Sequence, residues 1–166
     1  MKHLKLGRVL SLAVCICLAV TLLTAFSSVR SAHAATTSQA ACSNLNYSPG
    51  HWSLTANYKE IWTTCKGNKI SLNMQLDGNF VLYVNGQPKW ATNTSGRFIT
   101  GAYATFSTNG DLIVYVTNNV TGSLDVAWSS HTNGKGATRL SLQDDGNLVI
   151  YTAAGKTLWA SHTSGY

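Results

Sequence analysis

Three observations predict an all-β fold built from three similar units. Residues 75–83 (QLDGNFVLY), 107–115 (STNGDLIVY) and 143–151 (QDDGNLVIY) repeat one nine-residue pattern. Short runs of Val, Ile, Tyr and Trp are separated by stretches rich in Gly, Asn, Thr and Ser. No window carries apolar residues at the period of 3.6 that marks an amphipathic helix. Short strands joined by tight turns are therefore expected throughout.

The first 34 residues have the pattern of a secretory signal peptide. Lys2, Lys5 and Arg8 precede a mostly apolar run over residues 9–26, and Ala-His-Ala at 32–34 fits a cleavage site. A transmembrane anchor is the alternative, but polar residues interrupt the run and a cleavage signal follows it. No later stretch approaches the roughly 20 apolar residues of a membrane span. We expect a secreted, extracellular protein without membrane insertion.

The charge of the remaining chain argues against a nucleic-acid partner. Four of the twelve Lys and Arg residues lie in the signal segment, so eight basic and six acidic side chains remain, a formal charge of +2. Nucleic-acid sites need clustered Lys and Arg. The high isoelectric point of the whole chain is mainly a property of the signal segment.

Two cysteines remain after the signal segment, Cys42 and Cys65. An even pair in an exported chain predicts a disulfide, which would contribute about 3 kcal/mol through chain entropy. Two distant cysteines without a second pair of ligands do not make a metal site, so we expect no metal and no cofactor.

Residues 35–47 are read as an N-terminal arm and residues 48–166 as one domain of three repeats. Each nine-residue motif is followed by a Trp and a similar tail: Trp90-Ala-Thr-Asn-Thr, Trp128-Ser-Ser-His-Thr and Trp159-Ala-Ser-His-Thr. The second unit carries an insertion at 118–125 before its Trp. The repeated tryptophans are expected to fill the core between the units.

Each motif is predicted to form a hairpin. In the first, Ser71–Gln75 is one strand, residues 76–78 are the turn and Asn79–Tyr83 is the return strand, because Asp-Gly is a strong turn signal between alternating arms. Alternation then places one set of residues on the inner face. This set is Leu72, Met74, Phe80 and Leu82 in the first unit, Ala104, Phe106, Leu112 and Val114 in the second, and Leu140, Leu142, Leu148 and Ile150 in the third.

The outward residues of the first motif suit a sugar. The hairpin brings Gln75 opposite Asn79 with Asp77 between them, while Tyr83 lies further along and Val81 offers an apolar patch. Amides both donate and accept hydrogen bonds, and a carboxylate accepts strongly, which matches the hydroxyls of a hexose. Good turn chemistry alone would explain Asp-Gly-Asn, but it does not explain all five positions. The third motif repeats them as Gln143, Asp145, Asn147, Val149 and Tyr151.

The spacing Gln-x-Asp-x-Asn-x-Val-x-Tyr resembles the mannose-binding motif of the monocot bulb lectins, the snowdrop-type or B-type lectin family. The resemblance covers roughly residues 48–166. It implies a β-prism II fold, in which three four-stranded antiparallel sheets surround a pseudo-threefold axis. It also implies metal-free binding of mannose or mannosylated glycans, and a homodimer formed by exchange of the C-terminal strand.

The resemblance also implies a role for each matching residue. Asp77 and Asn79 would hold the axial 2-hydroxyl of mannose, Gln75 the 3-hydroxyl and Tyr83 the 4-hydroxyl, with Val81 packed against the ring. The corresponding residues of the third motif would act in the same way.

The chain departs from the family pattern in two places. The second motif reads Ser107, Asn109, Asp111, Ile113 and Tyr115, and Ser107 is too short to reach where a Gln would, so this site is expected to be weak or inactive. The family disulfide lies at the motif hairpins, whereas Cys42 and Cys65 both precede the first motif. That pair is expected to tie the arm to the first sheet.

Catalysis is not expected. The single Glu after the signal segment, Glu60, lacks a partner for acid–base work, and the adjacent Asp144 and Asp145 do not have the separation of a glycosidase pair. His131 and His162 occupy repeat-equivalent turn positions, where the first unit has Asn93. Two other functions remain open: a lectin-like antibacterial toxin that recognises surface polysaccharide, and a β-prism that binds proteins rather than sugars.

Overall fold

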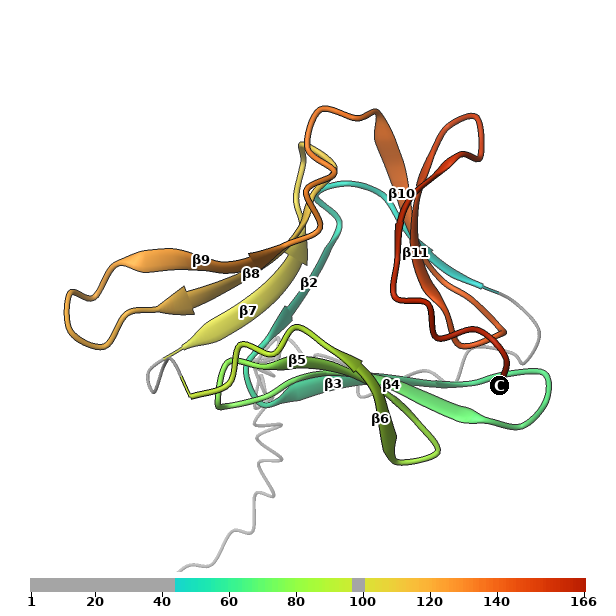
Figure 1. Cartoon of the computed structure of the whole chain (residues 1–166), viewed down its shortest axis with the longest axis horizontal. Coiled ribbons are helices and arrows are strands. Elements are labelled where there is room, and N and C mark those ends of the chain that lie inside the picture. Colours follow the sequence, from blue (N-terminus) through green and yellow to red (C-terminus); the bar gives the residue numbers. More distant parts are fainter. Residues whose placement is uncertain (1–43, 97–100) are drawn as a thin grey trace, which may run out of the picture. The chain divides into compact units, whose positions relative to one another are not determined.

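The computed structural model describes residues 44–96 and 101–166, which contain twelve β-strands and no helix. The strands form three antiparallel four-stranded sheets (Figure 1). The predicted all-β, β-prism II architecture is confirmed. No helix within the described ranges is long and apolar enough to cross a membrane. The predicted signal segment and Cys42 lie outside these ranges.

We number each sheet by the repeat that it contains. Sheet 1 has the order β3-β4-β5-β6, sheet 2 the order β2-β7-β8-β9, and sheet 3 the order β1-β10-β11-β12. The strands are β1 (Leu45–Tyr47), β2 (Trp52–Thr55), β3 (Tyr58–Thr63), β4 (Lys69–Met74), β5 (Phe80–Val84), β6 (Gln87–Ala91), β7 (Ala102–Phe106), β8 (Leu112–Thr117), β9 (Leu124–Ser129), β10 (Ala137–Leu142), β11 (Leu148–Thr152) and β12 (Thr157–Ala160).

The N-terminal strands are shared among the three sheets. Each repeat supplies three consecutive strands, and its fourth comes from residues 45–63: β1 pairs with β10, β2 with β7 and β3 with β4. In Figure 1 the cyan and green N-terminal strands accordingly lie in different sheets. The last three residues of the segment read as an arm, 45–47, thus form an edge strand of sheet 3. No single repeat is a complete sheet by itself.

The motif hairpins have the expected register, with a slightly longer turn. Ser71 is opposite Tyr83 and Met74 is opposite Phe80. Gln75 and Asn79 were expected at the strand ends, but they lie in the turn, where the Gln75 N–H donates to the Asn79 carbonyl at 2.9 Å. Gly78 has a φ of 85°, which glycine adopts without steric cost. The turn therefore presents the polar motif residues at the end of the sheet.

The predicted inward residues form the core. All twelve are at most 1% exposed, and they belong to one apolar cluster with contributions from all three sheets. Burying an aliphatic or aromatic side chain of this kind contributes roughly 1.5–3 kcal/mol. The core is therefore the main reason that the three units hold together.

The repeated tryptophans pack on this core and on one another. Trp90, Trp128 and Trp159 meet edge-to-face, with ring centroids 5.3–5.5 Å apart. They were expected to fill the core, but each is only half-buried, so the trio borders the cluster. Edge-to-face pairs add about 0.5–1.5 kcal/mol beyond area burial. One residue from each repeat thus links all three sheets.

The C-terminal strand is paired within its own chain. β12 pairs with β11, and beyond it the Ser161 N–H donates to the Leu148 carbonyl at 2.9 Å. The Gly165 N–H reaches the Asp145 carbonyl at 3.0 Å. Sheet 3 has four strands without an exchanged segment, and the predicted strand-exchanged dimer stays a prediction.

Candidate functional site

The outward groups of the first motif form a defined hydrogen-bonded frame. Gln75 Nε2 donates to the Tyr83 hydroxyl at 2.8 Å, across the hairpin. Asp77 Oδ1 accepts from the Asn79 backbone N–H at 3.0 Å, closing a local turn of the kind that Asp favours. The Tyr83 hydroxyl, having accepted one bond, still has its own proton to donate. Four predicted site residues are therefore brought together as expected.

The Asn79 side chain is oriented by the segment after β6. Its Oδ1 accepts from the Thr92 hydroxyl at 3.1 Å and from the Thr94 backbone N–H at 3.3 Å. Thr94 in turn donates its hydroxyl proton to the Gly78 carbonyl at 2.6 Å. Because the carbonyl end of the amide is used inside the protein, the Nδ2 end is left as the group that can donate to a ligand.

The third motif reproduces this frame. Gln143 Nε2 donates to the Tyr151 hydroxyl at 3.0 Å, and Asp145 Oδ1 accepts from the Asn147 N–H at 2.9 Å. Asn147 Oδ1 accepts from the hydroxyl of Ser161 at 3.0 Å and from the N–H of Thr163 at 3.2 Å. Two hairpins that lie 68 positions apart in the sequence thus present the same groups in the same arrangement.

The tail after each Trp is the part of the site that sequence reasoning missed. In repeats one and three, the hydroxyl residue two positions after the Trp and the Thr that ends the tail hold the carbonyl oxygen of the motif Asn side chain. In all three repeats the residue between these two positions has a left-handed backbone conformation. These residues are Asn93, His131 and His162, with φ of 57°, 55° and 58°. The interpretation of the two histidines as turn residues is confirmed. The recurrence of the tails was the available signal, but the bond to Asn could not be inferred from it.

The motif valines lie on the outward face but expose little surface. Val81 is 3% exposed and Val149 is 2% exposed, and neither belongs to the central cluster. Neighbouring outward side chains cover them, since Val81 is flanked by Asn73 on β4 and by Ala91 on β6. The apolar patch that was expected between the polar groups therefore exposes only a small area to solvent.

The two Asp residues occupy equivalent turns but differ in environment. Asp77 is exposed, whereas Asp145 is half-buried. The Tyr166 N–H approaches the Asp145 carbonyl at 3.3 Å, and the Tyr166 ring lies against Gly146, which brings the C-terminus beside this turn. The side chain of the neighbouring Asp144 accepts a hydrogen bond from the Cys65 N–H at 2.6 Å, just after the end of β3.

In the second motif, the residue equivalent to Asn79 is buried and both of its side-chain oxygens are hydrogen-bonded within the protein. Asp111, in the place of Asn79, is 6% exposed. Its Oδ1 accepts from the Ser130 hydroxyl at 2.7 Å and the Thr132 N–H at 3.0 Å, while its Oδ2 accepts from the Ser129 hydroxyl at 2.6 Å. Burial raises the pKa of this carboxyl, but the hydrogen bonds from Ser129, Ser130 and Thr132 outweigh it and leave the pKa lowered. Because Asp111 replaces Asn at this position, the amide donor of the intact motifs is missing from it.

Two further substitutions complete this change. Ser129 stands where the other repeats have Ala91 and Ala160, and its hydroxyl donates to the second oxygen of Asp111, which an Ala side chain cannot do. The single hydroxyl proton of Ser107 is shared between the Asn109 side-chain oxygen and the Asp111 carbonyl, and is not directed to Tyr115. The frame that joins Gln to Tyr is therefore missing from the second repeat.

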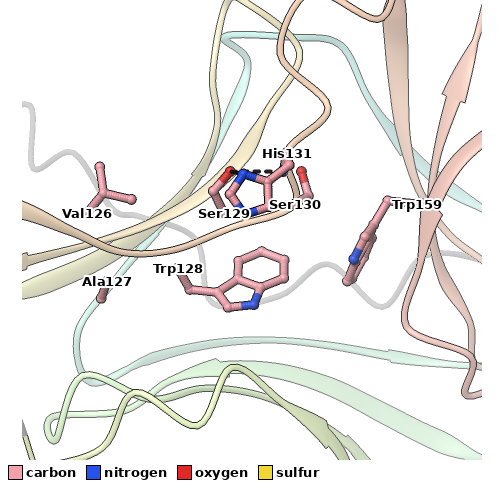
Figure 2. Close-up of a pocket in the computed structure, with 7 residues that line it drawn as sticks. All are labelled: Val126, Ala127, Trp128, Ser129, Ser130, His131 and Trp159. Carbon is pink, nitrogen blue, oxygen red and sulfur yellow. Dashed lines mark hydrogen bonds between the residues drawn. The ribbon is translucent and has the colours of Figure 1, made fainter.

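A pocket of about 520 Å³ lies beside two residues of the tryptophan trio. It is lined by Val126, Ala127, Trp128, Ser129, Ser130, His131 and Trp159 (Figure 2). No residue of the three nine-residue motifs contributes to it. Within residues 44–96 and 101–166, no group of three or more His, Cys, Asp and Glu side chains could hold a metal ion.

Comparison with known proteins places the chain in a family. A mannose-specific lectin of Aloe arborescens is 39% identical over 92 residues, which are 54% of this chain and 76% of that protein. A solved monomeric monocot mannose-binding lectin of Gastrodia elata is 30% identical, with a TM-score of 0.54, over 73% of this chain and 96% of that one. The lectin of Marasmius oreades, at 23% identity and a TM-score of 0.52 over 73% and 91% of the two chains, shares the fold.

No protein-family model matches the chain. The Aloe relative is nevertheless covered over most of its length at an identity well above the level at which only a fold is shared. Its similarity agrees with the three sheets and with the two intact motifs described above. The chain therefore belongs to the family of monocot bulb-type mannose-binding lectins.

Proposed function

We propose that this protein is a secreted lectin that binds α-D-mannose or mannose-containing glycans, without a metal ion, at the motifs of repeats one and three. The observation that carries the proposal is the duplicated frame in which Gln contacts Tyr and the post-Trp tail orients Asn. The relatives that the chain matches are themselves mannose-specific or mannose-binding lectins.

The groups left unused by this frame match the hydroxyls of one sugar. Each intact motif leaves an Asn Nδ2 as donor, the second Asp oxygen as acceptor, the Tyr hydroxyl proton as donor and the Gln carbonyl as acceptor. A hydroxyl both donates and accepts, so alternating donors and acceptors can bind neighbouring hydroxyls in pairs. The charge that holds the sugar is the Asp carboxylate, which makes the stronger kind of hydrogen bond.

Each site is expected to bind a single sugar weakly, and avidity between the two sites would strengthen binding of larger glycans. The motif residues lie in the hairpin turn and on the strand that follows it, and they line no pocket described above, so each site is expected to cover only part of a sugar. Two sites on one chain can engage two branches of a glycan or two glycans on a surface, which raises the overall strength of binding without any new contact. Export through the signal segment would bring these sites to extracellular glycans.

Calorimetric titration tests the proposal. The protein is titrated with methyl α-mannoside and separately with methyl α-glucoside, each with EDTA present. The expected result is weak binding of the mannoside with about two sites per chain and no detectable heat from the glucoside, whose 2-hydroxyl has the other configuration. The absence of mannoside binding in EDTA, with binding restored by a divalent cation, would contradict metal independence.

The two rival functions have different outcomes in the same test. A protein-binding β-prism would bind neither sugar. An antibacterial toxin would bind a surface polysaccharide and also kill sensitive cells, so a growth-inhibition assay distinguishes it from a simple lectin.

A further inference from the structure

The residue that faces the motif tyrosine differs in all three repeats. In the antiparallel register Ser71 is opposite Tyr83, Tyr103 is opposite Tyr115 and Arg139 is opposite Tyr151. The two intact motifs have the same five site residues. They differ chemically at the position opposite the tyrosine, which is Ser71 in repeat one and Arg139 in repeat three. A difference here can give two otherwise matched sites different ligands.

Arg139 places a positive charge directly beside the third motif. Its guanidinium carbon lies 4.8 Å from the centroid of the Tyr151 ring, and the side chain is exposed. In the described part of the chain the guanidinium contacts this ring and makes no ion pair with a carboxylate. Stacking on an aromatic face holds the planar group in place while its N–H donors remain available. Ser71 supplies no charge at the equivalent place in repeat one.

A β-bulge sets the position of Arg139. The pairing of β10 with β11 runs from Ala137 opposite Thr152 directly to Arg139 opposite Tyr151, so Thr138 is left without a partner. The same step is regular in the other repeats, where Ile70 and Ala102 are buried. In repeat three Thr138 is exposed, and Ala137 packs on the core instead. Bulges bend a strand and redirect side chains, and they are common beside binding sites.

The negative charges around the motif do not cancel this difference. Asp145 is common to both sites, since Asp77 has the same place in repeat one. Asp144 is specific to repeat three, but its carboxylate accepts the Cys65 N–H at 2.6 Å and is directed to the N-terminal segment, at the turn end of the hairpin. Arg139 lies at the other end, beside Tyr151.

We infer that site three, unlike site one, accepts a mannose carrying an anionic substituent, whose phosphate or carboxylate is bound by Arg139 next to Tyr151. The inference rests on the proposed function and makes its two sites unequal. Site one has Ser71 opposite its tyrosine and would lack this contact to the anionic group. A guanidinium suits both oxyanions because it can donate two parallel hydrogen bonds.

The test isolates site three by inactivating site one with Asp77→Ala in the full chain. This variant is titrated with methyl α-mannoside, mannose 6-phosphate and mannuronic acid, and the titrations are repeated with Arg139→Ser added, which copies repeat one. The expected result is that Arg139→Ser weakens binding of a charged sugar up to about fivefold, the upper end of the range for an exposed ion pair, and changes mannoside binding little. The effect should shrink in high salt. The phosphate and carboxylate arms show which anion is preferred.

The reciprocal variant is the matched control. Ser71→Arg, in a chain whose site three is inactivated by Asp145→Ala, should improve binding of the same charged sugar at site one, but by less than Arg139 does at site three, because the strand has no bulge at this step. An unchanged ratio of charged to neutral affinity in Arg139→Ser would overturn the inference while leaving the lectin function standing. Equal binding of inorganic phosphate alone would also overturn it, since the sugar would then contribute nothing. Failure of the unmodified chain to bind any of these sugars would instead reject the proposed function, and the inference with it.

Discussion

Trp52 donates its indole N–H to Glu60 Oε2 at 2.9 Å, and this bond joins two different sheets, because Trp52 lies on β2 and Glu60 on β3. The other carboxylate oxygen accepts the hydroxyl proton of Tyr47 on β1. Burial raises the pKa of that tyrosine, and its hydrogen bond to Glu60 and the charge of Glu60 raise it further, so Tyr47 stays a donor across the physiological range. One carboxylate thus fastens the three N-terminal strands, each in its own sheet.

Glu60→Ala is expected to lower the free energy of unfolding by about 2–4 kcal/mol, since it removes two bonds to a charged acceptor and leaves two donors unpaired. Glu60→Gln keeps one acceptor oxygen and should lose about half as much. Lys59→Ala, at an exposed neighbouring position, is the control and should have little effect. Urea denaturation provides the measurement. Equal stability of Glu60→Ala and Lys59→Ala would show that the clamp is not needed.

The lowered pKa of Asp111 predicts a loss of stability in acid. The contribution of this carboxylate is complete above the pKa of an unfolded Asp, about 3.9, and it is lost as the pH falls through the lower pKa of the folded state. Urea midpoints of the protein and of Asp111→Asn, measured between pH 2 and 6, should therefore differ most at the upper end and converge at the lower end. Parallel curves would contradict this.

The buried, hydrogen-bonded carboxylate of repeat two can be reproduced in repeat one by two substitutions. Asn79→Asp removes the Nδ2 donor, and Ala91→Ser supplies the hydroxyl that covers the second oxygen, as Ser129 does for Asp111. The double variant is expected to lose binding at site one and to fold as stably as the parent, within about 1 kcal/mol. The number of mannoside sites in calorimetry should fall from two to one. Two remaining sites would show that the amide donor is dispensable.

The site carboxylates can be removed at modest cost. Asp77→Ala and Asp145→Ala should each abolish one mannoside site, while loss of the local bond to Asn79 or Asn147 costs about 0.5–1.5 kcal/mol. The half-buried Asp145 should show the larger decrease in melting temperature. A loss of unfolding free energy far beyond this range would mean that the turns are essential for the stability of the fold. The loss of binding would then be only a consequence of unfolding.

The predicted bridge between Cys42 and Cys65 should stabilise the fold without affecting sugar binding. Replacement of both cysteines by Ser is expected to lower the free energy of unfolding by about 3 kcal/mol. The contact between the Cys65 N–H and Asp144 uses the backbone and should survive the change. Mass spectrometry under non-reducing conditions tests the pairing itself. Loss of mannoside binding in a folded variant would show that the bridge shapes a site.

Alternation and turn chemistry were enough to predict the three hairpins and their twelve inward residues, because both are local properties of the chain. The same reasoning brought Gln75, Asp77, Asn79 and Tyr83 together. It misjudged Val81, which is covered by residues on two neighbouring strands, and it treated the tryptophans as interior when they are half-buried. Those errors concern how far other strands cover a side chain, which local patterns do not encode.

By itself the sequence determined the repeat, the inward and outward faces, and the set of donors and acceptors at each motif. Only the tertiary structure decided which of those groups remain available to a ligand. The backbone N–H groups of Thr94 and Thr163, 15 and 16 positions away in the sequence, donate to the side-chain carbonyls of Asn79 and Asn147. It also decided that residues 45–63 supply one strand to each sheet, joined at Glu60, and that a bulge at Thr138 accompanies the placement of Arg139 over Tyr151. These features depend on contacts between distant segments, which form only when the three sheets close on a shared core.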